Sequence, residues 1–495
     1  MLKYLKNIAI FLCHLPFLAM LVSYFGDFNT RTLIICILWA ISSMLIYRFC
    51  RCLSEKQAFV LQTVLWIAGI IRMSYFGWIL AVEPAWDFGR IYHGALDITT
   101  NGALTYTMPY YLESYNNFFI TLCLVPWFII MSVVGVEPLY SGIILNILLI
   151  AFAQLFAVWT VNISSSKTDG LAVQIFCTLF LPFYTYAPIF YTDTFSMPFI
   201  TFVLLVYAVV KNKKVTKKTA LLLYVIAGIA TFLGFKLKPT AALAFIAIVI
   251  LSVLDEYKDS YKNIAAAVIT ICICSIGYSM FESNTDIINL SDIDDYRLPP
   301  EHYVMMGLKY NGGYNPEDHD FSLSFDNIRD RKDAEMQQIK DRLSEYGLSG
   351  YIRFLFGKIR YTWADGTFYA PHKLDIDPLR HSIAGEFFTE SGKYYDIYET
   401  VMSGVQLSLI IFMLIGSYNK KDIYVICSMC VFAAFVFLLI WETRSRYIVN
   451  LIPIFIVLAS DGIKRIEEKV YGKEKSKTGG PDYNRNLADR VNTGI

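Results

Sequence analysis

The chain has 495 residues, of which 56% are hydrophobic and only 17% are charged, and its mean hydropathy is +0.46. Soluble domains carry about 25% charged residues, so this composition excludes a protein that is soluble, disordered or fibrous as a whole. The 43 Lys and Arg residues nearly balance the 42 Asp and Glu residues, which gives no basic surface for nucleic acid.

About thirteen apolar segments approach the roughly 20 residues that a helix needs to cross a bilayer. They predict an all-α polytopic membrane protein with about 13 transmembrane helices. The segments are 8–25, 32–47, 58–82, 117–135, 139–162, 171–190, 194–210, 219–235, 240–254, 263–281, 399–417, 421–441 and 446–462. Three of them lie between residues 116 and 193, where the predicted sidedness requires an even number of crossings. One of these three is therefore expected to be re-entrant or of half length.

These segments divide the chain into four parts. The parts are an N-terminal transmembrane module at 1–281 with an acidic first outside loop at 83–116, an extracytoplasmic loop domain at 282–398, C-terminal transmembrane helices at 399–463, and a cytoplasmic polar tail at 464–495. Lys and Arg collect in cytoplasmic loops, and the strongest such signal is the lysine cluster within 211–218. We therefore expect a multi-pass protein of the cell membrane with a cytoplasmic N-terminus.

The first outside loop predicts an amphipathic helix on the outer membrane surface, because apolar side chains recur at helical spacing. These side chains are Phe88, Ile91, Tyr92 and Leu96. Asp87 lies at the N-terminal end of this helix, as an N-cap, as a carboxylate held at the membrane–water boundary, or as both. Glu83, Arg90 and His93 flank it and are candidate supporting residues.

Two further short polar segments interrupt apolar runs and are expected on the same side as Asp87. Asp193 forms either a simple turn or a functional carboxylate, because a carboxylate at that depth is costly unless it is solvated or paired. Lys236 and Lys238 stand where the positive-inside rule disfavours lysine. They either snorkel at a helix end or form an anion site ahead of the next helix.

The extracytoplasmic loop domain predicts helices at 330–346 and 351–361, followed by the sequence TWADGTF at 362–368. Its histidines have no metal-ligand spacing. No cofactor is predicted with certainty, and the need for a divalent metal ion is left open.

The most informative segment is the short turn at 441–447, which carries Glu442, Arg444 and Arg446 between two apolar helices. Arginine is expensive near hydrocarbon, and a guanidinium grips phosphate with two hydrogen bonds. The turn is therefore interpreted as a phosphate clamp, against the alternative of a structural ion pair with Glu442.

This layout resembles the integral-membrane glycosyltransferases of the GT-C superfamily, especially the protein-O-mannosyltransferase and lipid A aminoarabinose transferase-like branch. The sequence WDFGR at 86–90 looks like the first-loop acidic motif of that branch, and YTD at 191–193 looks like its second. The segments 236–240, 362–368 and 442–447 look similar to those of Gram-positive relatives.

The resemblance implies a bacterial enzyme that takes a sugar from a polyprenyl-phosphate donor in the membrane lipids and transfers it on the outer face. The acceptor would be a cell-envelope glycan, lipid or protein, such as a cell-wall polymer. Asp87 and Asp193 would be the catalytic carboxylates, and Lys236, Lys238, Arg444 and Arg446 would hold the donor phosphate. A carboxylate that takes the acceptor proton in a single displacement would invert the anomeric centre.

Two other functions stay open. A polysaccharide ligase or polymerase also uses outside arginines and a long loop, but it does not need the acidic amphipathic helix. A flippase for lipid-linked sugars would carry ionisable residues along a mid-membrane path, and Arg72, inside a predicted span, is the main residue of that kind.

Overall fold

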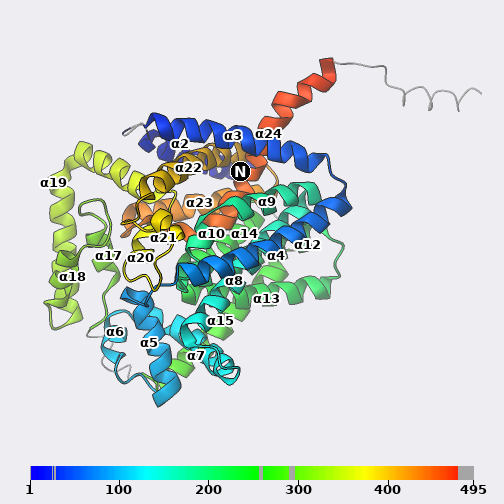
Figure 1. Cartoon of the computed structure of the whole chain (residues 1–495). Helices are drawn as coiled ribbons and strands as arrows, with labels where there is room; N and C mark the ends of the chain where they lie inside the picture. The colour runs from blue at the N-terminus through cyan, green and yellow to red at the C-terminus, as the bar shows by residue number, and fades with distance from the viewer. Residues whose placement is uncertain (1, 25, 27–28, 256–259, 289–295, 478–495) are drawn as a thin grey trace, which may run out of the picture.

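Helices account for the secondary structure of the residues that the computed structural model describes, which are 2–24, 26, 29–255, 260–288 and 296–477. The one β-type contact among them is an isolated antiparallel bridge between Val82 and Pro378. Eleven helices are long and apolar enough to cross a membrane, and most of them run side by side in one bundle (Figure 1). The prediction of an all-α polytopic membrane protein is confirmed.

The helices that precede the loop domain are α1 (Leu2–Leu12), α2 (Leu15–Tyr24), α3 (Thr30–Arg51), α4 (Glu55–Ile79), α5 (Trp86–Asn101), α6 (Met108–Glu113), η2 (Tyr115–Asn117), α7 (Phe118–Val133), α8 (Pro138–Ser164), α9 (Lys167–Leu179), α10 (Pro182–Thr185), α11 (Thr192–Phe195), α12 (Met197–Asn212), α13 (Lys217–Leu237), η3 (Pro239–Ala242), α14 (Leu243–Leu254) and α15 (Ser260–Asn284). The remainder are α17 (Pro300–Met306), α18 (Pro316–Leu323), α19 (Ile328–Trp363), α20 (Ala370–Leu374), α21 (Ile383–Phe388), α22 (Tyr395–Ser417), α23 (Asp422–Ile440), η4 (Ser445–Leu451) and α24 (Ile452–Lys477).

The predicted number of about thirteen spans is too high, because two apolar segments do not form helices of spanning length. In the segment 171–190, Phe180 adopts an extended backbone (φ −82°, ψ 102°), which ends α9 after 13 residues. In the segment 240–254, Pro239 opens a 3-10 turn, and only 12 residues of α-helix follow in α14. Apolar composition predicts burial in both segments, but it does not reveal where the helix breaks.

The chain between α9 and α11 passes through the bundle without forming a long helix. Three of its backbone carbonyls, those of Tyr186, Ala187 and Ile189, accept hydrogen bonds from the side-chain amide of Asn146 on α8, at 2.8, 3.0 and 3.2 Å. Irregular backbone at membrane depth requires such internal partners, because lipid offers none. One buried asparagine thus stabilises the passage.

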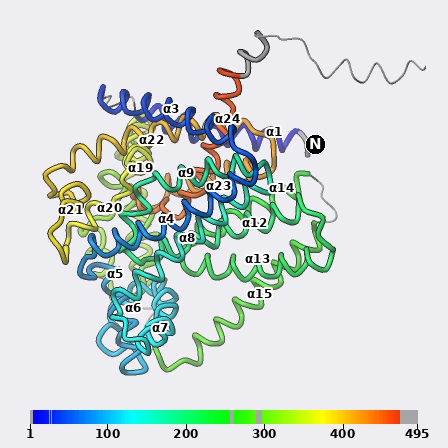
Figure 2. Tube along the Cα trace, turned by 45° about the vertical axis from the view of Figure 1, so that its right-hand side comes forward, coloured from blue at the N-terminus to red at the C-terminus, as the bar shows by residue number. Residues whose placement is uncertain are grey.

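Helix α7 is apolar enough to span, yet both of its ends lie at the end of the bundle that carries Asp87. The side chain of Asn117, just before α7, accepts a hydrogen bond from Tyr191. Beyond α7, the hydroxyl of Tyr140 near the start of α8 accepts one from Arg380, which also binds the Trp78 carbonyl near the end of α4. Helix α7 packs along α5 instead, and Figure 2 shows both beside α6 at one edge of the molecule. This accounts for the odd segment between residues 116 and 193.

Ion pairs gather at the opposite end of the bundle and join helices that are far apart in the sequence. The pairs are Lys6–Asp255 (2.6 Å), Arg51–Glu467 (2.8 Å), Lys211–Asp422 (3.3 Å) and Lys464–Asp169 (2.8 Å). The residues predicted to be cytoplasmic therefore share one end, which we call the lysine end. Helix α24 continues into the predicted tail as far as Lys477, and residues 478–495 lie outside the described residues.

Helices α22 and α24 approach each other closely at two glycines. A Cβ on Gly416 would lie 2.0 Å from the Leu458 carbonyl oxygen, and a Cβ on Gly462 would lie 2.0 Å from that of Phe412. Small residues at such crossings allow backbones to touch, which is a common way to join membrane helices. The contact fixes α24, which directly follows η4 and its arginine segment.

The loop domain forms a cap in which α17 and α18 pack beside the long helix α19, while α20 and α21 lie closer to the bundle (Figure 1). The backbone of Gly347 is non-helical (φ 54°) and divides α19 into two arms, which agrees with the two predicted helices. Arg342 binds both carboxylate oxygens of Asp318 at 2.7 Å and ties the cap together.

Candidate active site

Four of the predicted charged residues meet at one end of the bundle, and each comes from a different helix terminus. Asp87 lies in the first turn of α5, Asp193 in the short helix α11, Lys238 directly after α13, and Arg446 near the start of η4. Segments spread over 360 residues of sequence thus contribute to one cluster, as the sequence predicts.

Asp87 is the accessible carboxylate of this cluster. Its side chain is 37% exposed, and its nearest cation is Nη2 of Arg446 at 3.7 Å. The hydroxyls of Tyr110 and Tyr191 donate to it at 3.1 and 3.4 Å. The N-cap of α5 is Ala85, so the interpretation of Asp87 as an N-cap is wrong.

The turn that presents Asp87 depends on close backbone packing. Gly89 donates its N–H to the Ala85 carbonyl at 2.7 Å, and a Cβ on Gly89 would lie 2.4 Å from the Pro84 carbonyl oxygen. The apolar face of α5 packs on protein, with Phe88 4.6 Å from Phe190 between ring centroids. The helix is confirmed, but this face covers the bundle and α7 and does not lie on lipid.

Asp193 is buried and paired. Its side chain is only 4% exposed, and it accepts a hydrogen bond from the ammonium of Lys238, which is 13% exposed. A buried carboxylate at membrane depth requires such a partner. Lys238 also lies 5.6 Å from the ring centroid of Tyr447.

Arg446 lies in the middle of the cluster and is enclosed by aromatic rings. Its guanidinium carbon is 5.4 Å from the ring centroid of Trp86, 5.5 Å from that of Tyr191 and 5.2 Å from that of Tyr447. Its Nε and Nη1 atoms are buried and have no hydrogen-bond partner among the described residues. Buried donors without partners cost free energy, so these atoms are suited to receive an oxyanion.

Arg444 and Glu442 occupy the two sides of the same turn. The Arg444 guanidinium carbon lies 4.7 Å from the ring centroid of Tyr369, and its Nε is also buried and without a partner in the described structure. Glu442 accepts a hydrogen bond from Tyr447 at 2.7 Å, and its burial raises the pKa of its carboxyl group. No ion pair joins Glu442 to Arg444 or Arg446 in the part of the chain that is described, so that alternative is wrong.

The TWADGTF segment supports this turn. Asp365 accepts hydrogen bonds from the Thr367 backbone at 2.8 Å and from the hydroxyl of Ser445 at 2.5 Å. The hydroxyls of Thr362 and Thr443 are hydrogen-bonded at 2.8 Å. Asp365 therefore holds the loop and the arginine turn together.

Four of the predicted site residues lie away from the cluster. Lys236 pairs with Glu282 at 3.8 Å and lies 4.0 Å from the ring centroid of Tyr278, on the side of α13 that faces α15. The other three residues, Glu83, Arg90 and His93, have exposed side chains. In the described structure, none of these four pairs with Asp87, Asp193, Lys238 or Arg446. No sequence signal separates Lys236 from Lys238.

The structure adds one residue that the sequence does not indicate. Lys373 on α20 is buried, and its Nζ lies 3.8 Å from the ring centroid of Trp86. A lysine within a polar loop domain is normally solvated, so only the fold of the cap reveals its place beside Asp87 and Arg446.

The arrangement is suited to binding an anion beside a carboxylate. In the described residues, the cations Lys238, Lys373, Arg444 and Arg446 lie beside the carboxylates Asp87 and Asp193, and the carboxyl group of Glu442, whose pKa burial raises, lies in the same turn as the arginines. Trp86 and Tyr191 present aromatic faces beside them. Among the same residues, no three His, Cys, Asp or Glu side chains gather as a metal-ion site would require.

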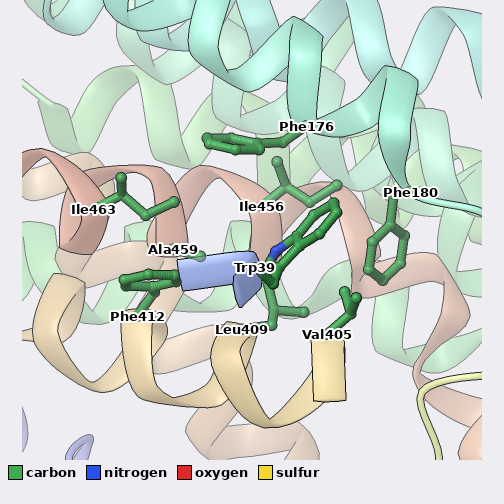
Figure 3. A pocket seen from close by; sticks show the side chains of 9 residues that line it. All are labelled: Trp39, Phe176, Phe180, Val405, Leu409, Phe412, Ile456, Ala459 and Ile463. Atoms are coloured by element: carbon green, nitrogen blue, oxygen red, sulfur yellow. The ribbon is translucent and has the colours of Figure 1, made fainter. Parts of the chain in front are cut away.

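A separate pocket lies between α3, α9, α22 and α24 (Figure 3). Its lining side chains are apolar and include Trp39, Phe176, Phe180 and Phe412. With no charged group to bind or transfer a proton, it offers no chemistry of the kind that the charged cluster does.

Residues 24–465 match the family described as "conserved hypothetical integral membrane protein". No curated protein matches the chain. The family description gives a membrane location and no reaction, and because the match covers most of the sequence and all of the charged cluster, the chain belongs to this family of integral membrane proteins.

Proposed function

We propose that this protein is a membrane glycosyltransferase of the GT-C type, which moves a sugar from a polyprenyl-phosphate donor to an acceptor on the outer face of the membrane. The observation that carries the proposal is the pairing of Asp87, a half-exposed carboxylate, with Arg446, a buried guanidinium 3.7 Å away that keeps two nitrogens unpartnered in the described structure. Transfer of a sugar from a phosphate needs both groups, a carboxylate to take the acceptor proton and a cation to stabilise the phosphate.

In this mechanism, the lipid tail of the donor stays in the bilayer, and its phosphate reaches the end of the bundle at headgroup level. Arg446 and Arg444 bind the phosphate oxygens, and Lys238 adds positive charge next to them. The face of Trp86 or Tyr191 supports the sugar ring. The binding site thus combines a cation clamp with aromatic walls.

Asp87 acts as the general base. It takes the proton from the acceptor hydroxyl as that oxygen attacks the anomeric carbon, while the bond from carbon to phosphate oxygen breaks. The electron pair goes to the phosphate, where the arginines stabilise it. One displacement inverts the anomeric centre. Asp193 is less suited to this role, because Lys238 already occupies its carboxylate.

The position of Arg72 weakens the case for a flippase. Its Nη2 donates to the Thr178 carbonyl at the C-terminus of α9, at 3.2 Å, and its guanidinium carbon lies 5.1 Å from the ring centroid of Tyr184. A cation at a helix C-terminus stabilises the helix dipole. Arg72 therefore has structural contacts that a transport path would have to break, and its Nε is buried without a hydrogen-bond partner among the described residues.

The test is a transfer assay with membranes, a radiolabelled polyprenyl-phosphate sugar and a panel of cell-envelope acceptors. Label that moves once to an acceptor supports the transferase, and label built into growing chains supports a polymerase or ligase. Label that only changes leaflet supports a flippase. Asp87→Asn should slow transfer by on the order of 10²-fold or more, whereas Asp320→Asn, at an exposed acid of the cap, should not.

A further inference from the structure

Lys373 is placed over an aromatic ring in the charged cluster. Its Nζ lies 3.8 Å from the ring centroid of Trp86 and 5.7 Å from that of Tyr369, and its side chain is largely buried. Within the described residues, the ammonium has neither a hydrogen bond nor an ion pair. A cation–π contact satisfies the charge in part, but it uses none of the three N–H donors for an oxygen.

The two rings place Lys373 between the two arginines of the clamp. Trp86 is shared with Arg446, whose guanidinium carbon is 5.4 Å from its ring centroid. Tyr369 is shared with Arg444, whose guanidinium carbon is 4.7 Å from its ring centroid. Three cations therefore lie against the rings of Trp86 and Tyr369. Like charges repel at such distances, and an anion bound among them would reduce this repulsion.

The charge of Lys373 responds to its surroundings. Burial, with Arg446 and Arg444 as further causes, lowers the pKa of Lys373 to about 7, while Asp87 and Asp193 act in the opposite direction. The neighbouring His372 pairs with Glu390 at 2.8 Å and stacks on Tyr369, with ring centroids 4.6 Å apart. An anion added beside Lys373 would raise its pKa, because an opposite charge favours the protonated form.

The reaction of the proposed function creates such an anion. The donor is a phosphodiester with one negative charge. When the carbon–oxygen bond to the sugar breaks, the electron pair stays on the phosphate, which becomes a monoester with a second negative charge. The acceptor proton goes to Asp87, so the phosphate needs positive charge from other groups.

We propose that Lys373 is a third phosphate-binding residue, which acts with Arg444 and Arg446 and stabilises the additional charge of the leaving phosphate. This inference rests on the proposed function, since it takes the cluster as the site of a prenyl phosphate. It assigns to Lys373 a preference for the monoester product over the diester donor, which a purely structural lysine would not give.

The test uses the purified full-length protein and two soluble probes, farnesyl phosphate as the monoester and farnesyl methyl phosphate as the diester. Calorimetric titration at pH 7.5 should show that Lys373→Met weakens monoester binding by about tenfold or more, since a charge-assisted hydrogen bond is lost. Diester binding should weaken by about threefold or less. The matched control is Lys393→Met, at an exposed lysine of the same domain, and it should bind both probes as the wild type does.

A second readout measures protons. The diester does not titrate near neutral pH, so a proton taken up on its binding comes from the protein. With a pKa of about 7 for free Lys373, titrations of the diester at pH 7 in buffers of different ionisation enthalpy should show uptake of up to about a third of a proton per ligand, which is the amount linked to a threefold gain in affinity. Lys373→Met should show none, and Lys373→Arg should bind the monoester well without proton uptake.

The outcomes separate the two proposals. If the wild type binds neither probe, the proposed function fails together with this inference. If the wild type binds and Lys373→Met keeps the same monoester preference, or loses both probes equally, only the role of Lys373 is overturned. If Lys373→Met does not fold, proton uptake that persists in Lys373→Arg overturns it instead.

Discussion

The ammonium of Lys238 donates a hydrogen bond to the carboxylate of Asp193 inside the bundle end. The other acidic group of the cluster, Asp87, is arranged differently, because its nearest cation is 3.7 Å away and its side chain is 37% exposed. One carboxylate is thus neutralised by a dedicated partner, and the other is open to an acceptor. This difference assigns the two acids separate roles and allows each role to be tested.

Replacing Asp87 by Asn should leave a folded protein with a transfer rate lower by on the order of 10²-fold or more, because the amide accepts no proton at neutral pH. The amide can still accept the hydrogen bond from Tyr110, and Ala85 remains the N-cap. Asp87→Glu should keep partial activity. Initial rates with radiolabelled donor measure the effect. Near-normal turnover in a well-expressed Asp87→Asn protein would move the base to Asp193.

Replacing Lys238 by Met should destabilise the protein by about 3–5 kcal/mol, because Asp193 is left buried without its partner. The double variant Lys238→Met/Asp193→Asn should regain most of this stability without regaining donor binding. Thermal unfolding in detergent and donor titration measure the two effects. A single variant as stable as the wild type would show that the ion pair does not stabilise the fold.

Arg446→Ala should weaken donor binding by about tenfold or more, because charge-assisted hydrogen bonds to phosphate are lost. Arg446→Lys should restore little, since a point charge lacks the planar fork of the guanidinium. Arg353→Ala, at an exposed arginine of α19, is the control. If Arg446→Ala and Lys238→Ala both keep the donor KM of the wild type, the phosphate is bound elsewhere.

Membrane sidedness can be measured with single cysteines. The exposed native residues Cys52 and Cys272 are first replaced by Ser. A cysteine at Asp320, in the cap, should then react with an impermeant thiol reagent in intact cells, because the cap is expected outside. A cysteine at Lys214, at the lysine end, should react only after permeabilisation. The reverse pattern would place Asp87 in the cytoplasm and contradict transfer on the outer face.

The sequence predicts most of the helices, because apolar length alone decides whether a segment can be buried in a bilayer. It does not predict the break after Leu179 or the sidedness of α7. These depend on tertiary partners such as Asn146 and Arg380, whose side chains bind backbone or hydroxyl groups far away in the sequence.

The charged cluster could be predicted as far as its members interrupt apolar runs. Asp87, Asp193 and Lys238 stand out for this reason, and they do meet. Lys236 stands out equally, but residues two apart near a helix end point to nearly opposite sides. Lys373 could not be predicted, because its burial is produced by the folding of the cap against Trp86.

The irregular passage from Phe180 to Tyr191 has a consequence for biosynthesis. A nascent helix can leave the translocon alone, because its own hydrogen bonds satisfy its backbone. This passage is less able to do so, since three of its carbonyls accept hydrogen bonds from Asn146, and that of Ala187 has no other donor among the described residues. We infer that α8 must already be in the bilayer when the passage enters it. Asn146→Leu should therefore lower the yield of inserted protein, which protease protection of newly made chains would measure, and a normal yield would contradict this order of assembly.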